Sequence, residues 1–234
     1  MPSIPTRERG GHLQLVVRGA RRPQVLIVDS DLGRQATLCV ALGTRYEPEA
    51  AASSVEAIDR AGVRRFELAV VDAAVVDGAL GRVVGLLRHR VPRARIVLIA
   101  GRRHLGARHR ADVLGLDAVL ASARTRGLLE QVRTLAGHAA AGAVAPSVGR
   151  AIDLMAADVT HLLDVESLAE AARSTLTQLD WDFRAAVGLG VHEYVMRVRV
   201  VVARRLLRDT ALDVETLAGL LGFADGAELA TMIL

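Results

Sequence analysis

Short apolar runs alternate with stretches of helical periodicity between residues 24 and 136. Val, Ile and Leu dominate four of these runs and the second is weaker; in chain order they are Gln24–Val28, Tyr46–Ala50, Glu67–Asp72, Arg95–Ala100 and Asp117–Leu120. Runs of this kind are typical of buried parallel strands. The positions between them predict helices at about 32–44, 54–62, 79–90, 103–114 and 124–136. This alternation predicts a doubly wound α/β fold with a five-stranded parallel sheet.

After residue 136 the pattern predicts helices alone. Gly137–Val148 consists mostly of small residues, with Gly and Pro among them, which is typical of a linker. Beyond it the sequence has no strand signal, and apolar positions recur at helical spacing in 151–163, 166–173, 176–187, 192–208 and 214–221. We therefore expect a basic flexible arm over 1–22, an α/β domain over 23–136, a linker over 137–148 and an all-α domain over 149–234.

Composition narrows the class of protein. Hydrophobic residues make up 51% of the chain and charged residues 24%, which is a globular balance. The single cysteine, Cys39, excludes an intramolecular disulfide, and its surroundings LCVALG favour a buried side chain. No stretch approaches the roughly 18 apolar residues of a membrane span, and the first 23 residues lack the apolar core of a signal peptide. We expect a cytoplasmic protein with no membrane partner.

Two aspartates end strands of the expected sheet. Asp29 follows the first strand in VLIVDSD, and Asp72 ends the third in FELAVVD. Function in parallel sheets gathers at the carboxyl ends of the strands, where paired carboxylates can hold Mg²⁺ or attack phosphate as oxygen nucleophiles. The alternative is that these aspartates cap the helices that follow. Spacing alone leaves both interpretations open.

Four segments of this half carry a family resemblance. VLIVDSD, FELAVVD, IVLIAG and GLDAVLASA follow one another in the order found in receiver domains of two-component response regulators. Gln24–Ala136 therefore resembles a receiver domain over its whole expected length. The resemblance implies a flavodoxin-like fold, with Asp72 in the phospho-acceptor position and Asp29 among the acids that hold Mg²⁺.

Several positions around the expected acceptor depart from the family's pattern. The second acid of the pair is replaced by Ser30, with Asp31 one place later. Ile99 stands where the fourth strand normally ends in a hydroxyl, and Ser122 where the fifth normally has a lysine. Phosphoryl transfer depends on cations and donors placed around the transferring oxygens. We therefore predict a pseudo-receiver in which Mg²⁺ binding at Asp29 is weak or lost, with Asp31 as a further candidate ligand.

Arginines crowd the region that corresponds to the pairing face of receiver domains, about residues 103–136. The candidate partner-binding residues are Arg102, Arg103, Arg108, Arg110, Arg124 and Arg126. A solvated helix surface is one interpretation, and a docking face for an acidic partner is the other. That partner could be another protein, a second copy of this chain in a homodimer, or the chain's own all-α half.

Two segments of the all-α half carry a second resemblance. They are HEYVMRVRVVVARRLLRDTALDVETLAGLLGFAD at 192–225 and, more weakly, VESLAEAARSTLTQLDWDFRAAVG at 165–188. They resemble the second and first helix–turn–helix units of the DNA-binding domain of the AraC/XylS family of transcription regulators. The resemblance implies that the second helix of each unit enters the major groove. The chain stops at Leu234, inside the expected second recognition helix, so we expect that unit to be incomplete.

DNA contacts are expected mainly from the first unit and from the helix between the units. The candidates on 176–187 are Thr177, Gln178, Trp181 and Arg184, and those on 192–208 are Arg197, Arg204, Arg205 and Arg208. Residues 148–234 hold 8 arginines and 13 acids, a net charge of −5, whereas 1–147 hold 22 and 13, a net charge of +9. Phosphate neutralisation dominates DNA affinity, so we expect DNA binding by the acidic second half to be weak. The difference in charge also favours docking of the two halves on each other.

These patterns predict a transcription regulator with an atypical receiver domain and an AraC-type helix–turn–helix domain. The alternative is a degenerate regulator that acts as a protein-binding adaptor or assembly component without DNA readout. An enzyme has little support, because the sequence shows no cluster with catalytic or metal-ligand spacing. Apart from Mg²⁺ at the acid pair, we expect no cofactor.

Overall fold

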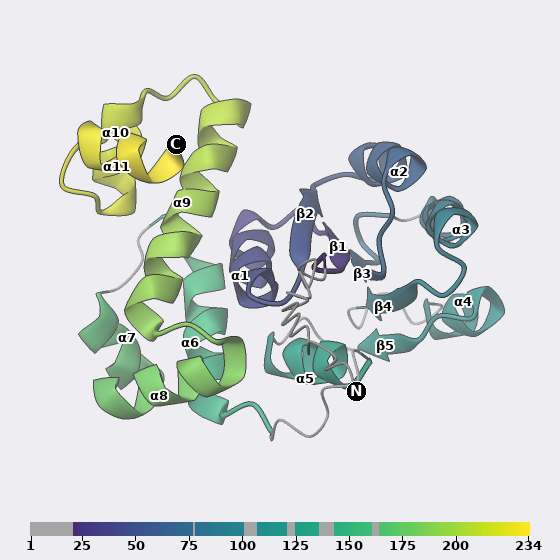
Figure 1. Cartoon of the computed structure of the whole chain (residues 1–234), viewed down its shortest axis with the longest axis horizontal. Helices are drawn as coiled ribbons and strands as arrows, with labels where there is room; N and C mark the ends of the chain where they lie inside the picture. Colours follow the sequence, from purple (N-terminus) through teal and green to yellow (C-terminus); the bar gives the residue numbers. More distant parts are fainter. Residues whose placement is uncertain (1–20, 77, 101–106, 121–124, 136–142, 161–163) are drawn as a thin grey trace, which may run out of the picture.

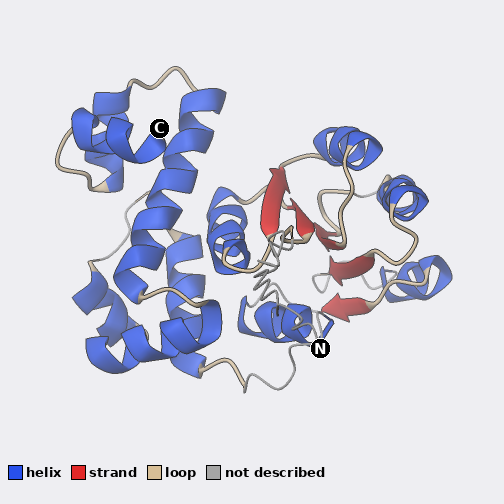
Figure 2. Cartoon of the chain, in the orientation of Figure 1, coloured by secondary structure: helices blue, strands red, loops and turns tan. Residues whose placement is uncertain are grey.

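A parallel sheet forms the centre of the α/β half. The computed structural model describes residues 21–234 apart from 77, 101–106, 121–124, 136–142 and 161–163. The strands are β1 (Gln24–Val28), β2 (Glu47–Ala51), β3 (Leu68–Asp72), β4 (Arg95–Ile99) and β5 (Ala118–Leu120). Their order across the sheet is β2-β1-β3-β4-β5 (Figures 1 and 2). This is the order of flavodoxin-like folds, which confirms the predicted fold class.

Helices cover both faces of this sheet. They are α1 (Leu32–Gly43), α2 (Ser54–Val63), α3 (Leu80–Arg90), α4 (Ala107–Leu114) and α5 (Thr125–Leu135). α1 and α5 lie on one face, and α2, α3 and α4 lie on the other (Figure 1). Ile27 belongs to the core on the α1 side, and its neighbour Leu26 belongs to the core on the α2 side. Because successive strand residues point to opposite faces, a strand buried on both sides is apolar along its whole length.

The described part of the second half consists of helices joined by turns and loops, without a strand. Its helices are α6 (Pro146–Ala157), α7 (Val165–Ala171), α8 (Leu176–Val187), α9 (Val191–Asp209), α10 (Val214–Leu221) and α11 (Gly226–Ile233). α6 begins five residues earlier than expected, so the last part of the predicted linker is helical. Proline suits the first helical turn because it has no amide hydrogen to leave unpaired, and Val148 is buried in the core. No single described helix is long and apolar enough to cross a membrane, although the bent pair α10 and α11 passes that test when taken together.

α1 lies between the sheet and the helical half (Figure 1). It packs on α6 and α9 as well as on β1 and β2, and every residue from Gln35 to Leu42 is buried, including Cys39 as predicted. At its C-terminal end the Thr44 hydroxyl donates to the carbonyl oxygen of Val187 at 2.8 Å. One hydrophobic cluster therefore runs from the strands through α1 into α6, α8 and α9, and the two halves share a core.

Two further contacts fix α1 against the helical half. The Tyr194 hydroxyl, which is fully buried, donates to the carbonyl oxygen of Thr37 at 2.6 Å. Gly33 approaches α6 so closely that a Cβ at this position would lie 2.0 Å from the carbonyl oxygen of Ala156. A buried hydroxyl without a partner would be costly, so the burial of Tyr194 depends on the position of the Thr37 carbonyl oxygen in the other half.

Candidate functional site

Asp29 and Asp72 lie close together at the carboxyl edge of the sheet, because β1 and β3 are neighbouring parallel strands. The Asp29 side chain is 2% exposed, and that of Asp72 is 13% exposed. Asp29 Oδ1 accepts a hydrogen bond from the amide of Asp31, and Asp72 Oδ1 accepts one from the amide of Ala74, each at 2.8 Å. The structure thus brings together the two aspartates that the sequence places at the acceptor and metal positions.

The guanidinium of Arg34, in the first turn of α1, bridges the two carboxylates. Its Nε donates to Asp29 Oδ2 at 2.8 Å, and one terminal nitrogen donates to Asp29 Oδ1 at 2.7 Å. The same terminal nitrogen lies 3.1 Å from Asp72 Oδ2. Two parallel bonds of this kind are among the stronger ionic contacts in proteins. The hydrogen bond to Asp29, together with the charges of the nearby carboxylates, raises the pKa of Arg34 above its usual value, so the side chain stays cationic.

Asp31 serves as the N-cap of α1. Its Oδ1 accepts from the amide of Arg34 at 2.9 Å, which is the usual role of an aspartate one position before a helix. Ser30 is exposed. The carboxylate that we considered as a further metal ligand is therefore used by the helix, and the capping interpretation applies to Asp31 rather than to Asp29.

Hydrocarbon replaces a hydroxyl beside the expected acceptor. Ile99 ends β4 opposite Asp72 in the strand register and is 3% exposed. An isoleucine side chain has no donor to offer a phosphoryl oxygen. Ser122, at the place of the family's lysine, lies outside the described residues.

The acid pair does not fit a divalent metal ion in this arrangement. Mg²⁺ requires oxygen ligands in near-ideal octahedral geometry, and both carboxylate oxygens of Asp29 are held by the guanidinium of Arg34. Within the described ranges, no group of three or more His, Cys, Asp or Glu residues could hold a metal. The positive charge beside the aspartates is supplied by the chain itself.

Arg34 is the site residue that sequence reasoning missed. The first turn of α1 contains no acidic residue, and a cation there is unfavourable because it faces the positive end of the helix dipole. An arginine in such a turn therefore signals an acidic partner nearby. Asp29, five residues earlier at the end of a strand, is that partner.

Two helix pairs stand at opposite ends of α9 (Figure 1). α10 and α11 are bent by 94° relative to each other, and the turn between them, 222–225, opens with Gly222 in the left-handed region at φ 72°. α7 and α8 are also joined by a turn of four residues, 172–175, in which Arg173 has φ 56°. The two connections are thus of equal length, and each uses one left-handed residue.

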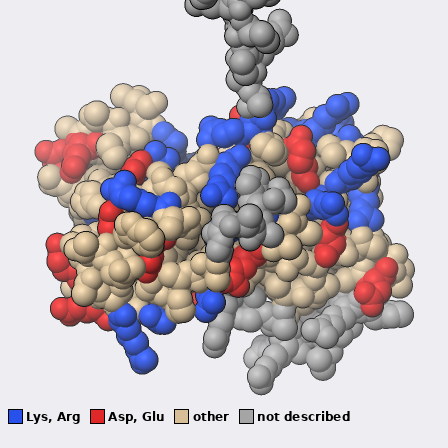
Figure 3. All heavy atoms as spheres, turned by 60° about the horizontal axis from the view of Figure 1, so that its bottom comes forward, with Lys and Arg blue, Asp and Glu red and all other residues tan. Residues whose placement is uncertain are grey.

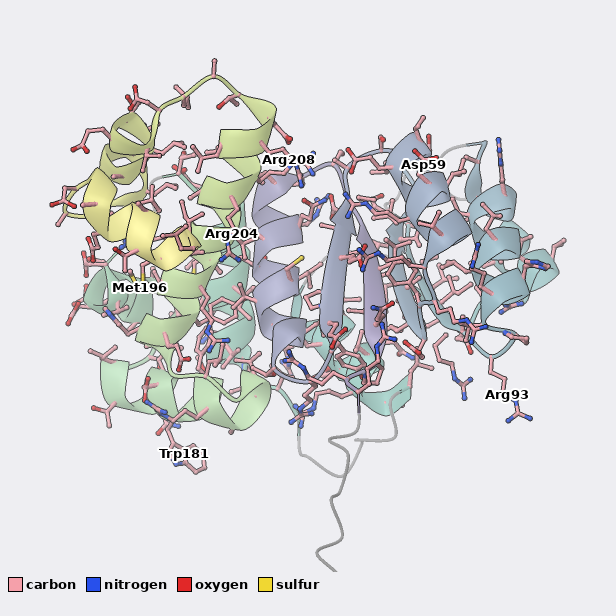
Figure 4. All side chains as sticks on the ribbon, turned by 45° about the horizontal axis from the view of Figure 1, so that its top comes forward. Asp59, Arg93, Trp181, Met196, Arg204 and Arg208 are labelled. Carbon is pink, nitrogen blue, oxygen red and sulfur yellow. The ribbon has the colours of Figure 1, made fainter. Side chains whose placement is uncertain are left out.

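The four candidate DNA contacts of α8 are exposed on one side of the helix: Thr177, Gln178, Trp181 and Arg184. Trp181 is 68% exposed and projects away from the helical half (Figure 4). The Gln178 amide donates to Asp182 at 2.8 Å, and Arg184 donates to Asp180 at the same distance. Acidic neighbours therefore already hold two of the four side chains.

The arginines of α9 do not form one free basic stripe. A terminal nitrogen of Arg204 donates to the carbonyl oxygen of Ile233 in α11 at 2.8 Å. Arg205 is only 17% exposed, pairs with Asp209 and lies 3.9 Å from Glu56 of α2. Arg197, Arg204 and Arg208 are exposed, and Arg197 and Arg208 each pair with an acid of α9. Arg205 is the least accessible of the four arginines, and the contact of this group with DNA phosphates stays a prediction.

One of the candidate partner-binding arginines contacts the helical half. Arg126 lies against Gly149 of α6 and pairs with Glu130 at 3.1 Å. The main contact between the halves is nevertheless made by α1 and is apolar, which differs from the predicted docking through charge. Arg102, Arg103 and Arg124 lie outside the described residues, as do the side chains of Arg108 and Arg110.

The contact between the halves is largely apolar, although the halves differ in charge. Basic side chains are denser over the α/β half and acidic ones edge the helical half (Figure 3). One ion pair across the contact, Arg205 with Glu56, has its cation on the helical half and its anion on the α/β half, opposite to the net charges of the two halves. Burial of apolar surface, as in a domain core, holds α1 in place.

Neither a family model nor a curated protein matches this chain. Solved structures similar to it include a CheY-like receiver domain protein from Methanospirillum hungatei, with 23% identity, a TM-score of 0.43 and coverage of 52% of this chain and 99% of that one. A sensor histidine kinase receiver domain from Pseudomonas aeruginosa, solved with magnesium in its active site cleft, has 18% identity, a TM-score of 0.42 and coverage of 50% and 98%. A Burkholderia pseudomallei response regulator with a phosphorylated aspartic acid has 22% identity, a TM-score of 0.41 and coverage of 65% and 93%.

Proposed function

We propose that this chain is a transcription regulator of the response-regulator type that binds DNA through AraC-like helix–turn–helix units. The observation that carries the proposal is the geometry of α10 and α11, which are bent by 94° about a four-residue turn containing Gly222. Helices at about 90–120° joined by a short turn that often contains glycine are the features of this motif. α7 and α8 have a turn of the same length, and α8 is then the first recognition helix.

In this proposal the receiver-like half binds a partner or a second copy and does not switch by conventional phosphorylation. Arg34 bridges the two aspartates, and Ile99 offers no donor to a phosphoryl group. α1 is covered by α6 and α9, and α5 also packs on α6. The proposed contact surface for a protein partner is the part of the arginine-rich region 103–136 that α6 leaves uncovered. We expect the protein to act in the cytoplasm and to catalyse no reaction.

The second candidate function is an adaptor without DNA readout, which the surface of α8 favours. Trp181 is 68% exposed, and tryptophan is enriched among residues that dominate protein interfaces. Arg184 already pairs with Asp180, which lowers its net attraction to phosphate. A protein partner that covers Trp181 would explain both observations.

Binding of the full chain to a pool of fragments from its own genome tests the proposal. We expect selective binding at about 50 mM salt that weakens but persists at about 200 mM, because phosphate contacts make affinity salt-dependent. Binding that is absent, or unselective and lost at the higher salt, contradicts DNA readout and favours the adaptor.

Variants of α8 locate the contact. Arg184→Ala and Gln178→Ala should each lower selective affinity by roughly 5- to 150-fold, corresponding to about 1–3 kcal/mol for a base contact. Arg93→Ala removes the same charge from an exposed loop of the α/β half (Figure 4) and should change affinity less than about two-fold. Equal losses in Arg184→Ala and Arg93→Ala, with no loss in Gln178→Ala, would assign the binding to overall charge.

A further inference from the structure

The acid pocket at the edge of the sheet contains its own cation. The Arg34 guanidinium makes two parallel hydrogen bonds to Asp29, at 2.8 and 2.7 Å, and extends to Asp72 Oδ2 at 3.1 Å. It therefore touches both carboxylates at the point where a metal ion shared by them would have to lie. Asp29, with a side chain that is 2% exposed, needs such a partner, because a buried carboxylate without one is strongly destabilising.

We propose that Arg34 is a tethered cation that takes the place of a divalent metal, so that Asp29 and Asp72 do not bind Mg²⁺ while Arg34 is present. A metal ion entering this pocket would have to break the paired bonds to Asp29 and hold a double positive charge beside the guanidinium. Arg34 is attached to α1 and is present at a fixed, high local concentration, whereas a metal ion must be taken from solution. The inference goes beyond the proposed function, since it holds whether or not the helical half binds DNA.

The backbone around Arg34 favours a fixed position for this cation. Asp31 caps α1 through the Arg34 amide at 2.9 Å, and the side chain amide of Gln35 donates to the carbonyl oxygen of Asp29 at 2.9 Å. Gly33, next to Arg34, touches the carbonyl oxygen of Ala156 in α6. The first turn of α1 is thus held from both sides, and the guanidinium cannot withdraw by a movement of the helix alone.

A magnesium titration of the full chain tests the inference, with the amide NMR signals of residues 29–31 and 72–74 as the readout. Wild type should show no saturable shift at these signals up to about 20 mM MgCl2, whereas Arg34→Gln should show one. The melting temperature of Arg34→Gln should also rise with MgCl2, because a ligand that binds only the folded state stabilises it.

Two variants serve as controls, one for the positive charge at position 34 and one for the site at which Mg²⁺ binds. Arg34→Lys keeps a cation and should remain without a saturable magnesium shift. Arg34→Gln combined with Asp72→Asn removes one of the two carboxylates and should lose most of the binding that Arg34→Gln gains, by at least about ten-fold in Kd.

Two outcomes overturn the proposal. One is a wild-type chain that binds Mg²⁺ at these residues as tightly as Arg34→Gln does. The other is a folded Arg34→Gln chain that gains no magnesium shift, since then something other than Arg34 prevents binding. If Arg34→Gln does not fold, the wild-type titration decides: saturable shifts at 29–31 and 72–74 contradict the proposal, and their absence together with the same result for Arg34→Lys supports it.

Discussion

The helix pairs at the two ends of α9 have the same plan but different attachments. Both have turns of four residues, and both of their second helices begin with a side-chain cap. α8 packs on α6 and α9, and its Phe183 lies 5.1 Å from the ring of Tyr194, which bonds to Thr37 in the α/β half. α10 and α11 pack chiefly on α9 and on each other. Both pairs contribute side chains to the same hydrophobic cluster, but a pair attached mainly to one helix can open alone more readily than a pair packed on several elements.

The exposed surfaces of the two second helices differ as well. α8 presents Trp181 and Arg184, while the exposed side of α11 carries Glu228, Thr231 and Met232. α11 contains no arginine or lysine. Turns of equal length therefore do not make the two pairs equivalent, because the attachment and the surface chemistry of each pair differ.

The largest expected effect concerns the cores of the two pairs. Phe183→Ala should lower the free energy of unfolding of the whole chain by about 3–5 kcal/mol, because the cavity lies where α8 packs on α6 and α9, beside the ring of Tyr194. Leu229→Ala, at an equally buried position of α11, should mainly increase the local opening of α10 and α11. Urea unfolding gives the first value, and hydrogen exchange of α1 and α11 amides separates global from local opening.

Faster exchange in α7 and α8 alone, with α1 still protected in Phe183→Ala, would show that both helix pairs open locally. Similar local effects in the two variants, with a changed unfolding midpoint in the α/β half for Phe183→Ala alone, would support the difference in attachment.

The turns should respond to substitution with opposite signs. Gly222→Ala places a Cβ on a residue at φ 72° and should destabilise the chain by about 1–2 kcal/mol. Arg173 adopts φ 56° although it is not a glycine. Arg173→Gly should therefore stabilise the folded chain by up to about 1 kcal/mol, once the greater conformational entropy of glycine in the unfolded chain has been subtracted. Thermal unfolding measures both, and Arg173→Ala controls for loss of charge. Destabilisation by Arg173→Gly would contradict the account.

The smallest expected effect depends on pH. The hydrogen bond from Arg184, together with that from the Val191 amide, lowers the pKa of Asp180. A lowered pKa contributes stability above the unfolded-state value of about 3.9 and loses it as the pH falls through the folded-state value. Asp180→Asn should therefore cost on the order of 0.5 kcal/mol at pH 7 and almost nothing near the acid end of a urea-unfolding series.

Glu215 is the counterpart in the other pair, where it accepts a hydrogen bond from the Gly226 amide at 2.9 Å. Asp180 pairs with Arg184, whereas the ion pairs described for this chain include none with Glu215. We expect Glu215→Gln to change stability less than Asp180→Asn does at pH 7. A larger loss of stability in Glu215→Gln would show that the hydrogen bond to the first amide of the helix contributes more than the ion pair with arginine.

The strands were predictable because burial on both faces leaves a continuous apolar run, and β1 lies at Gln24–Val28 as expected. Asp29 and Asp72 could also be placed, since parallel strands end at the same edge of a sheet. The role of Arg34 was not predictable from spacing, because a single arginine near an acid is common and its orientation depends on tertiary packing. Arg205 shows the same limit: it lies on the predicted stripe by helical periodicity, yet α2 approaches it from the other half.

The contact of α1 with the helical half has a signal in the sequence of α1. LGRQATLCVALG has almost no polar side, which is the pattern of a helix buried all round, whereas a helix that covers only one face of a sheet should be amphipathic. What covers the second side could not be known, because Thr37 and Tyr194 are separated by 157 residues. The early start of α6 was missed for the same reason, because the burial of Val148 in the shared core depends on contacts with distant parts of the chain.

The position of α1 has a consequence for synthesis of the chain on the ribosome. Tyr194 follows Thr37 by 157 residues, which at bacterial to eukaryotic translation speeds is an interval of roughly 8–30 s. Throughout it, the side of α1 that will meet α9 has no covering helix, and the side that will meet α6 has none until α6 is made, although the sheet beside α1 can already form. The nascent α/β half therefore exposes an apolar surface that can associate with other chains. A chaperone that binds apolar segments during translation should raise the yield of folded protein more than one that acts after release.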